Sequence, residues 1–203
     1  MNIKRIWLII PALLMPYVVL TALAVIMFSA DNEFCGFIMD EVLGGNALWI
    51  VPILLMYSFV AMILSALCLI MGIKGNWEAL PVAKMTMIIK LIQIPAYVVI
   101  FLLSAIFIMM IFTIGFAIAF AFFDFLTLLM SGMLGILSVV QAIRNGKVSF
   151  KESWWVILLQ FIYCADVVAT VIFYVKLKKV NAKEPETVQK VTNAEMIDWI
   201  PNC

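Results

Sequence analysis

The chain has no histidine among its 203 residues. This absence excludes a histidine general base, imidazole metal ligands and a histidine pH switch. Cysteine is sparse, and its four positions form no C-x-x-C pair that would predict a metal or redox motif. The catalytic patterns G-x-S-x-G, H-E-x-x-H, Walker A and G-x-G-x-x-G are also missing from the sequence. We therefore expect no enzymatic activity, no cofactor and no metal site.

Charged residues are also few. They make up 12% of the chain, whereas 67% is hydrophobic and the mean hydropathy is +1.18. A soluble domain has about 25% charged residues, so this chain lacks the polar side chains to cover a globule. The surplus apolar surface must face lipid, which predicts an integral membrane protein. Since 13 Lys+Arg nearly balance 12 Asp+Glu and no basic patch is interleaved with aromatics, we expect no nucleic-acid partner.

Long apolar runs predict the fold. A membrane-spanning helix needs about 20 mostly apolar residues. We therefore expect an all-α integral membrane bundle of five transmembrane helices, over 6–29, 47–73, 91–112, 116–142 and 154–175. An alternative has four crossings, with 116–142 as a re-entrant hairpin. In both cases the bundle is predicted to occupy 1–179, and a polar C-terminal tail 180–203.

The charges outside these runs predict the orientation. Lys4 and Arg5 precede the first run, whereas the loop 31–46 is acidic and contains neither lysine nor arginine. Because cytoplasmic loops collect lysine and arginine near helix ends, we expect a cytoplasmic N-terminus and an external loop 31–46. The lysine-rich segment 176–179 then lies outside with five crossings, and inside if 116–142 is re-entrant. Counting charges does not separate these two topologies.

Two segments resemble a known group of proteins. LPVAKMTMIIKLIQIPAYVV (80–99) and LQFIYCADVV (159–168) are similar to segments of an uncharacterised family of small multi-span membrane proteins from clostridia and related Gram-positive bacteria. The resemblance covers the membrane part of the chain and is looser in the tail. It implies location in a bacterial plasma membrane, but it implies no activity, substrate or functional residue.

Small residues recur along one face of the second and fourth runs. A spacing of three and four residues places them on one side of a helix, where a neighbouring backbone can approach closely. Such stripes mediate helix packing in membranes, because lipid provides no hydrophobic drive for helices to associate. We predict packing roles for Ser58, Ser65, Gly72, Ser131 and Gly135.

Polar residues form a stripe on the fifth run. At about 100° per residue, five of them fall within a sector of about 120°. They are Gln160, Tyr163, Asp166, Thr170 and Tyr174. The fourth run has a similar stripe that contains Asp124 and Thr127.

The two aspartates are the strongest candidates for a functional site. A charged side chain at the bilayer centre costs about 2.5–3.5 kcal/mol on insertion scales, and no lysine or arginine lies within the predicted runs. Asp166 is therefore expected to be protonated, hydrated or bound to a cation. We predict that Asp166 faces Asp124 across the bundle, with Tyr163, Thr127 and Thr170 as auxiliary ligands for a proton, an ion or a polar solute. A structural carboxyl that hydrogen-bonds a neighbouring helix is the alternative.

Two functions are consistent with these patterns. The first is a non-enzymatic membrane scaffold, regulator or complex subunit, favoured by the small size, the short loops and the polar tail. The second is a transporter or channel for a small solute, a proton or a cation, which would use Asp124 and Asp166. The expected partners are the lipid bilayer and either further copies of the chain or another membrane protein.

Overall fold

The computed structural model describes residues 7–109, 114–162 and 164–198, with side chains up to residue 182. Four of its helices are long and apolar enough to cross a membrane, as expected of a membrane protein. They are α1 (Ile10–Phe28), α3 (Ile50–Lys74), α4 (Ala79–Met109) and α5 (Ile114–Arg144). Within the described ranges there is no strand, so the all-α prediction is confirmed for them.

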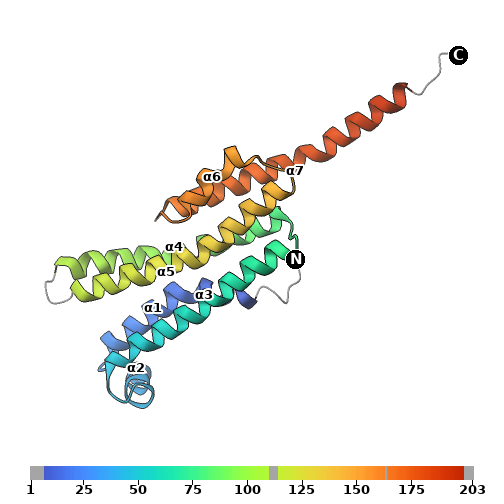
Figure 1. The fold of residues 1–203 in the computed structure, drawn as a ribbon. Helices are drawn as coiled ribbons and strands as arrows, with labels where there is room; N and C mark the ends of the chain where they lie inside the picture. Colours follow the sequence, from blue (N-terminus) through green and yellow to red (C-terminus); the bar gives the residue numbers. More distant parts are fainter. Residues whose placement is uncertain (1–6, 110–113, 163, 199–203) are drawn as a thin grey trace.

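These four helices pack as a bundle (Figure 1). Helices α4 and α5 form a long hairpin, in which the ring of Phe107 lies 5.8 Å from that of Phe120. Helix α1 contacts α3, α4 and α5. At one end of the bundle Arg144 Nη1 donates to the carbonyl of Ile73 at 2.6 Å, so the ends of α5 and α3 are adjacent. The acidic loop 31–46 lies at the other end, where it forms the short helices α2 (Glu33–Phe37) and η2 (Ile38–Val42).

A proline inside α1 is matched by a side chain of α4. Pro16 has no N–H, so it leaves the carbonyl of Ala12, four residues earlier, without its helical donor. Gln93 Nε2 of α4 donates to this carbonyl at 2.9 Å. Backbone groups freed by proline must find partners inside a membrane. This hydrogen bond therefore joins α1 to α4 and fixes the position of one helix along the axis of the other.

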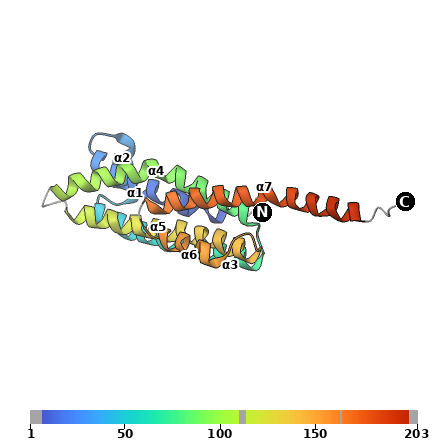
Figure 2. The same ribbon diagram turned by 90° about the horizontal axis from the view of Figure 1, so that it is seen from above.

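The last apolar run differs from its prediction. Residues 154–175 do not form one crossing helix, because the helix is interrupted between α6 (Phe150–Leu159) and α7 (Ala165–Asp198). The two helices are antiparallel neighbours (Figures 1 and 2). Glu152 binds Lys176 at 2.7 Å, and Gln160 Nε2 donates to Thr170 Oγ1 at 3.0 Å. Cys164, in the turn, has the positive φ of 65° that reverses the chain.

The alternative topology, with residues 116–142 as a re-entrant hairpin, also differs from the structure. Helix α5 is continuous from Ile114 to Arg144, so 116–142 does not turn back. The helical hairpin is α6–α7 instead. Helix α7 then continues past the bundle as a single helix to Asp198 (Figure 1). The predicted boundary between the bundle and a tail at 180 stays a prediction.

Candidate functional site

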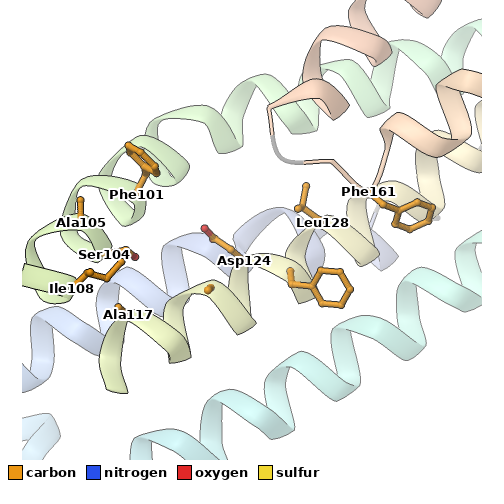
Figure 3. Close-up of a pocket in the computed structure, with 10 residues that line it drawn as sticks. Phe101, Ser104, Ala105, Ile108, Ala117, Asp124, Leu128 and Phe161 are labelled. Atoms are coloured by element: carbon orange, nitrogen blue, oxygen red, sulfur yellow. The ribbon is translucent and has the colours of Figure 1, made fainter. Parts of the chain in front are cut away.

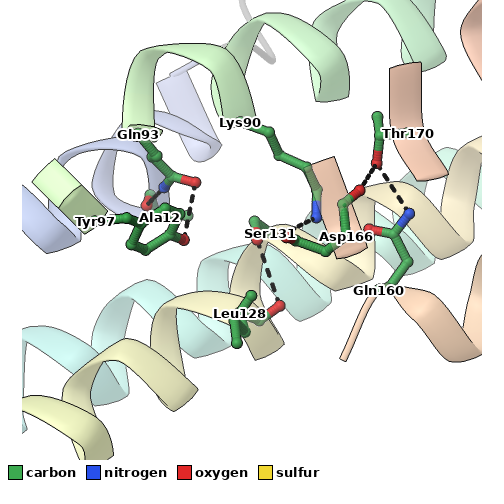
Figure 4. Close-up of polar contacts among 9 residues, drawn as sticks. All are labelled: Ala12, Lys90, Gln93, Tyr97, Leu128, Ser131, Gln160, Asp166 and Thr170. Atoms are coloured by element: carbon green, nitrogen blue, oxygen red, sulfur yellow. Dashed lines mark hydrogen bonds and ion pairs between the residues drawn. The ribbon is translucent and has the colours of Figure 1, made fainter. Parts of the chain in front are cut away.

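Asp166 in the first turn of α7 binds a lysine of α4. Lys90 Nζ lies 2.6 Å from Asp166 Oδ2, and the two side chains are 0% and 1% exposed (Figure 4). The expectation that Asp166 has no basic partner is therefore wrong. The third apolar run is predicted to begin at residue 91, which leaves Lys90 just outside the predicted span. Helix α4 begins earlier, at Ala79, and carries Lys90 into the interior of the bundle.

The geometry of this pair suits a buried position. Removing two charges from water costs several kcal/mol per ion, which mutual attraction offsets only when the contact is close and hydrogen-bonded. The ammonium of Lys90 donates directly to the carboxylate, and such charge-assisted bonds are about twice as strong as neutral ones. The net charge of the two side chains is zero. Asp166 therefore needs neither a proton nor a bound ion to be neutralised.

A threonine and a glutamine join the pair to the α6–α7 turn (Figure 4). Thr170 Oγ1 donates to the carbonyl of Asp166 at 2.7 Å and accepts a hydrogen bond from Gln160 Nε2 at 3.0 Å. Gln160 is the C-cap residue of α6, and all three side chains are buried. Thr170 thus contacts the backbone of Asp166 and the side chain of Gln160, and its role as an auxiliary ligand stays a prediction.

Polar side chains continue from Lys90 along α4. Gln93 lies one turn further on, where it binds Ala12 of α1 and accepts a hydrogen bond from Tyr97 Oη at 3.3 Å. Lys90, Gln93 and Tyr97 are spaced by three and four residues, so they share one face of the helix. This spacing was visible in the sequence. Extending the stripe of Gln93 and Tyr97 back by one turn would have identified Lys90.

Asp124 lies in different surroundings. It lines a cavity of about 500 Å³ between α4 and α5, together with Ser104 (Figure 3). Since the carboxylate of Asp166 is bound to Lys90, the structure does not pair it with Asp124 as predicted. Thr127 Oγ1 donates to the carbonyl of Phe123 in its own helix at 2.9 Å. The predicted role of Tyr163 falls outside the described residues.

The small residues predicted to pack helices are buried. Ser58, Ser65 and Gly72 are among the buried residues of α3, and Ser131 and Gly135 are among those of α5. A Cβ added at Gly72 would lie 2.4 Å from Leu137 Cδ2 of α5. One added at Gly135 would lie 2.3 Å from Gln160 Cδ. Gly72 therefore allows close contact between α3 and α5, and Gly135 allows close contact between α5 and the end of α6.

The chemistry available to this site is limited. Across the described ranges, no group of three or more cysteine, aspartate or glutamate side chains could hold a metal ion. The amine of Lys90 and the carboxylate of Asp166 satisfy each other. The arrangement holds α4 and α7 together and fixes the position of the α6–α7 turn.

Comparisons of this chain with protein-family models, with curated proteins and with solved structures find no match. The resemblance to a clostridial family therefore stays a prediction.

Proposed function

We propose that the chain is a non-enzymatic membrane scaffold or complex subunit, located in a bacterial plasma membrane. The observation that carries the proposal is the buried ion pair between Lys90 and Asp166. The alternative of transport uses Asp124 and Asp166 together, whereas Asp166 binds Lys90. The lysine beside Asp166 supports a structural role for this carboxylate instead. The continuous helix α7, which extends beyond the bundle, offers a partner protein a surface outside the membrane (Figure 1).

The proposed topology has four crossings and one re-entrant helical hairpin, α6–α7. Asp166 precedes Lys176 by ten residues, or about 15 Å of helix, which is half of a hydrocarbon core about 30 Å thick. The hairpin would therefore turn back near the middle of the bilayer. Re-entrant backbone is tolerated at this depth where protein surrounds it. The buried Gln160, which contacts Thr170 and lies against Gly135, is consistent with such protection.

The distribution of charge supports a cytoplasmic location for both ends of this hairpin. The end of the bundle where α5 meets α3 carries Lys74, Arg144, Lys147 and Lys151. Lys147 contacts Asn181 of α7, so α7 leaves the bundle at this same end. The loop at the opposite end contains four acidic residues and no basic one, namely Asp31, Glu33, Asp40 and Glu41. By the positive-inside rule, the basic end is cytoplasmic.

Thiol labelling on intact cells tests this topology. Cys35 should react with an impermeant reagent, whereas Cys203 should react only after lysis. Variants that retain only one of these two cysteines report the labelling of each position separately. Labelling of Cys203 on intact cells would show that α6–α7 crosses the membrane and would contradict the hairpin.

A flux assay tests the assignment as a scaffold. Proteoliposomes with the purified chain should show no proton or monovalent-cation flux above empty liposomes. The native mass of the protein, extracted from its own membrane in mild detergent, should exceed that of one chain. A flux that Asp166→Asn abolishes, while the variant keeps its helical content, would establish transport and overturn the proposal.

A further inference from the structure

The cavity that contains Asp124 lies between helices α4 and α5 (Figure 3). Its volume of about 500 Å³ is in the range of small-molecule sites, about 300–1,000 Å³. One wall is a face of α4 and the other a face of α5, and Phe161 of the α6–α7 turn also lines the cavity. Small side chains on both helices, Ala105, Ala117 and Ala121, leave the space open.

One carboxylate dominates the chemistry of this cavity. Asp124 and Ser104 are the only polar side chains among the ten residues that line it, and both point into the space between the helices (Figure 3). In the described part of the chain no lysine or arginine pairs with Asp124, and no hydrogen-bond donor reaches it. An intramembrane charge without a partner is unfavourable. A cation that enters the cavity would neutralise it.

Three phenylalanine side chains line the same cavity as the carboxylate. Phe101, Phe125 and Phe161 line the cavity and are 62%, 50% and 40% exposed, so they lie at its mouth. Their exposed faces are directed away from the protein, toward the bilayer in a spanning bundle. The face of an aromatic ring attracts organic cations, with a contribution of about 0.5–2 kcal/mol. The mouth therefore suits a ligand that is both apolar and positively charged.

We propose that this cavity binds a lipophilic organic cation that enters from the bilayer. The cationic centre contacts the carboxylate of Asp124, with the hydroxyl of Ser104 beside it, and the apolar body lies among the phenyl rings. The zwitterionic headgroup of a phospholipid fits less well, because none of the ten lining residues is a lysine or arginine that would bind its phosphate. This proposal holds whether or not the chain is a scaffold.

Tetraphenylphosphonium is a suitable probe, because tetraphenylborate has the same shape and the opposite charge. Binding is measured by equilibrium dialysis at pH 8, with the full chain in phosphatidylcholine nanodiscs and empty nanodiscs as background. We expect saturable binding of one tetraphenylphosphonium per chain. Asp124→Asn should weaken this binding by about ten-fold or more, and tetraphenylborate, dialysed in a separate experiment, should show no saturable binding.

Two further variants distinguish binding inside the cavity from nonspecific attraction of the probe to any carboxylate. Ala121→Phe fills the cavity but keeps the carboxylate, so it should also abolish saturable binding. Glu152→Gln removes an exposed carboxylate elsewhere and should bind tetraphenylphosphonium like the wild type. Circular dichroism checks the folding of each variant. Should Asp124→Asn fail to fold, retained binding by Ala121→Phe would still overturn the proposal.

Four other outcomes also overturn it. They are no saturable binding above empty nanodiscs, unchanged binding by a folded Asp124→Asn variant, equal saturable binding of tetraphenylborate measured alone, and displacement of the probe when phosphatidylethanolamine replaces phosphatidylcholine. The last result would identify a lipid headgroup as the occupant in place of a free cation.

Discussion

The two aspartates inside the helices show how strongly the surroundings determine what a carboxylate does. Asp166 is buried against Lys90, and Thr170 and Gln160 fix the turn beside it. Asp124 faces a cavity lined by apolar side chains and Ser104. Both residues lie in apolar runs of the sequence. The difference arises from α4, whose first half presents a lysine to α7 and whose second half presents alanine and phenylalanine to α5.

The largest effect is expected on the Asp166 side of this comparison. Asp166→Leu leaves the ammonium of Lys90 buried without a counter-charge, so the free energy of unfolding should fall by about 3–5 kcal/mol. Unfolding by sodium dodecyl sulfate in mixed micelles, followed by circular dichroism, measures this loss. The double variant Lys90→Met/Asp166→Leu contains no unpaired charge and should recover most of the stability. A double variant as unstable as Asp166→Leu alone would contradict the ion-pair explanation.

A smaller effect is expected where α5 supports the α6–α7 hairpin. The Cβ of Gly135→Ala would lie 2.3 Å from Gln160 Cδ, so the Gln160 side chain must move. We expect a loss of about 1–3 kcal/mol in the free energy of unfolding. Gly132→Ala is the matched control, since its Cβ would make an ordinary contact of 3.6 Å with Gln160 Cβ. Equal stability of the two variants would indicate that α6 does not pack closely against α5.

On the other side of the comparison, Asp124→Leu should barely change stability. The carboxylate of Asp124 has no ion-pair partner among the described side chains, so removing it breaks no contact. We expect the free energy of unfolding to rise or to stay within about 0.5 kcal/mol of the wild type. The same micelle titration measures it. A loss as large as that of Asp166→Leu would show that Asp124 also binds a partner and would end the contrast.

The smallest effect concerns the exposed pair at the open end of the hairpin. The hydrogen bond and charge of Lys176 lower the pKa of Glu152 below its usual value. Any stability that this pair contributes is present above the ordinary glutamate pKa of about 4.3 and is lost as the pH falls through the lower folded pKa. The melting temperature of Glu152→Gln should therefore lie slightly below that of the wild type at pH 7 and should converge with it in acid. A difference in melting temperature that grows as the pH falls would contradict the predicted direction of the pH dependence.

Much of the bundle could be predicted from the sequence, because the long apolar runs correspond to α1, α3, α4 and α5. The break after Gln160 could not. The run 154–175 is mostly apolar, and no proline or glycine marks the turn at Cys164. Its reversal goes together with tertiary contacts, such as the hydrogen bond of Gln160 to Thr170 and the ion pair of Asp166.

The partner of Asp166 was missed for a related reason. Lys90 ends the segment 74–90, whose second half is expected at the membrane interface, leading into the third span. The beginning of α4 at Ala79 places it inside the helix. The spacing of Lys90 from Gln93 places it on the buried face of α4, but its counter-charge belongs to another helix, so the local sequence does not identify the pair.

The separation of Lys90 and Asp166 along the chain determines the order in which the protein can mature. The two residues are 76 positions apart. At a translation rate of about 5–20 residues per second, Lys90 is made about 4–15 s before its counter-charge. During that interval the flexible stem of the lysine allows its ammonium to reach toward the headgroups. The bundle thus acquires its final form only when the last hairpin docks, so we expect a nascent chain that ends before Asp166 to leave the ammonium of Lys90 without its counter-charge.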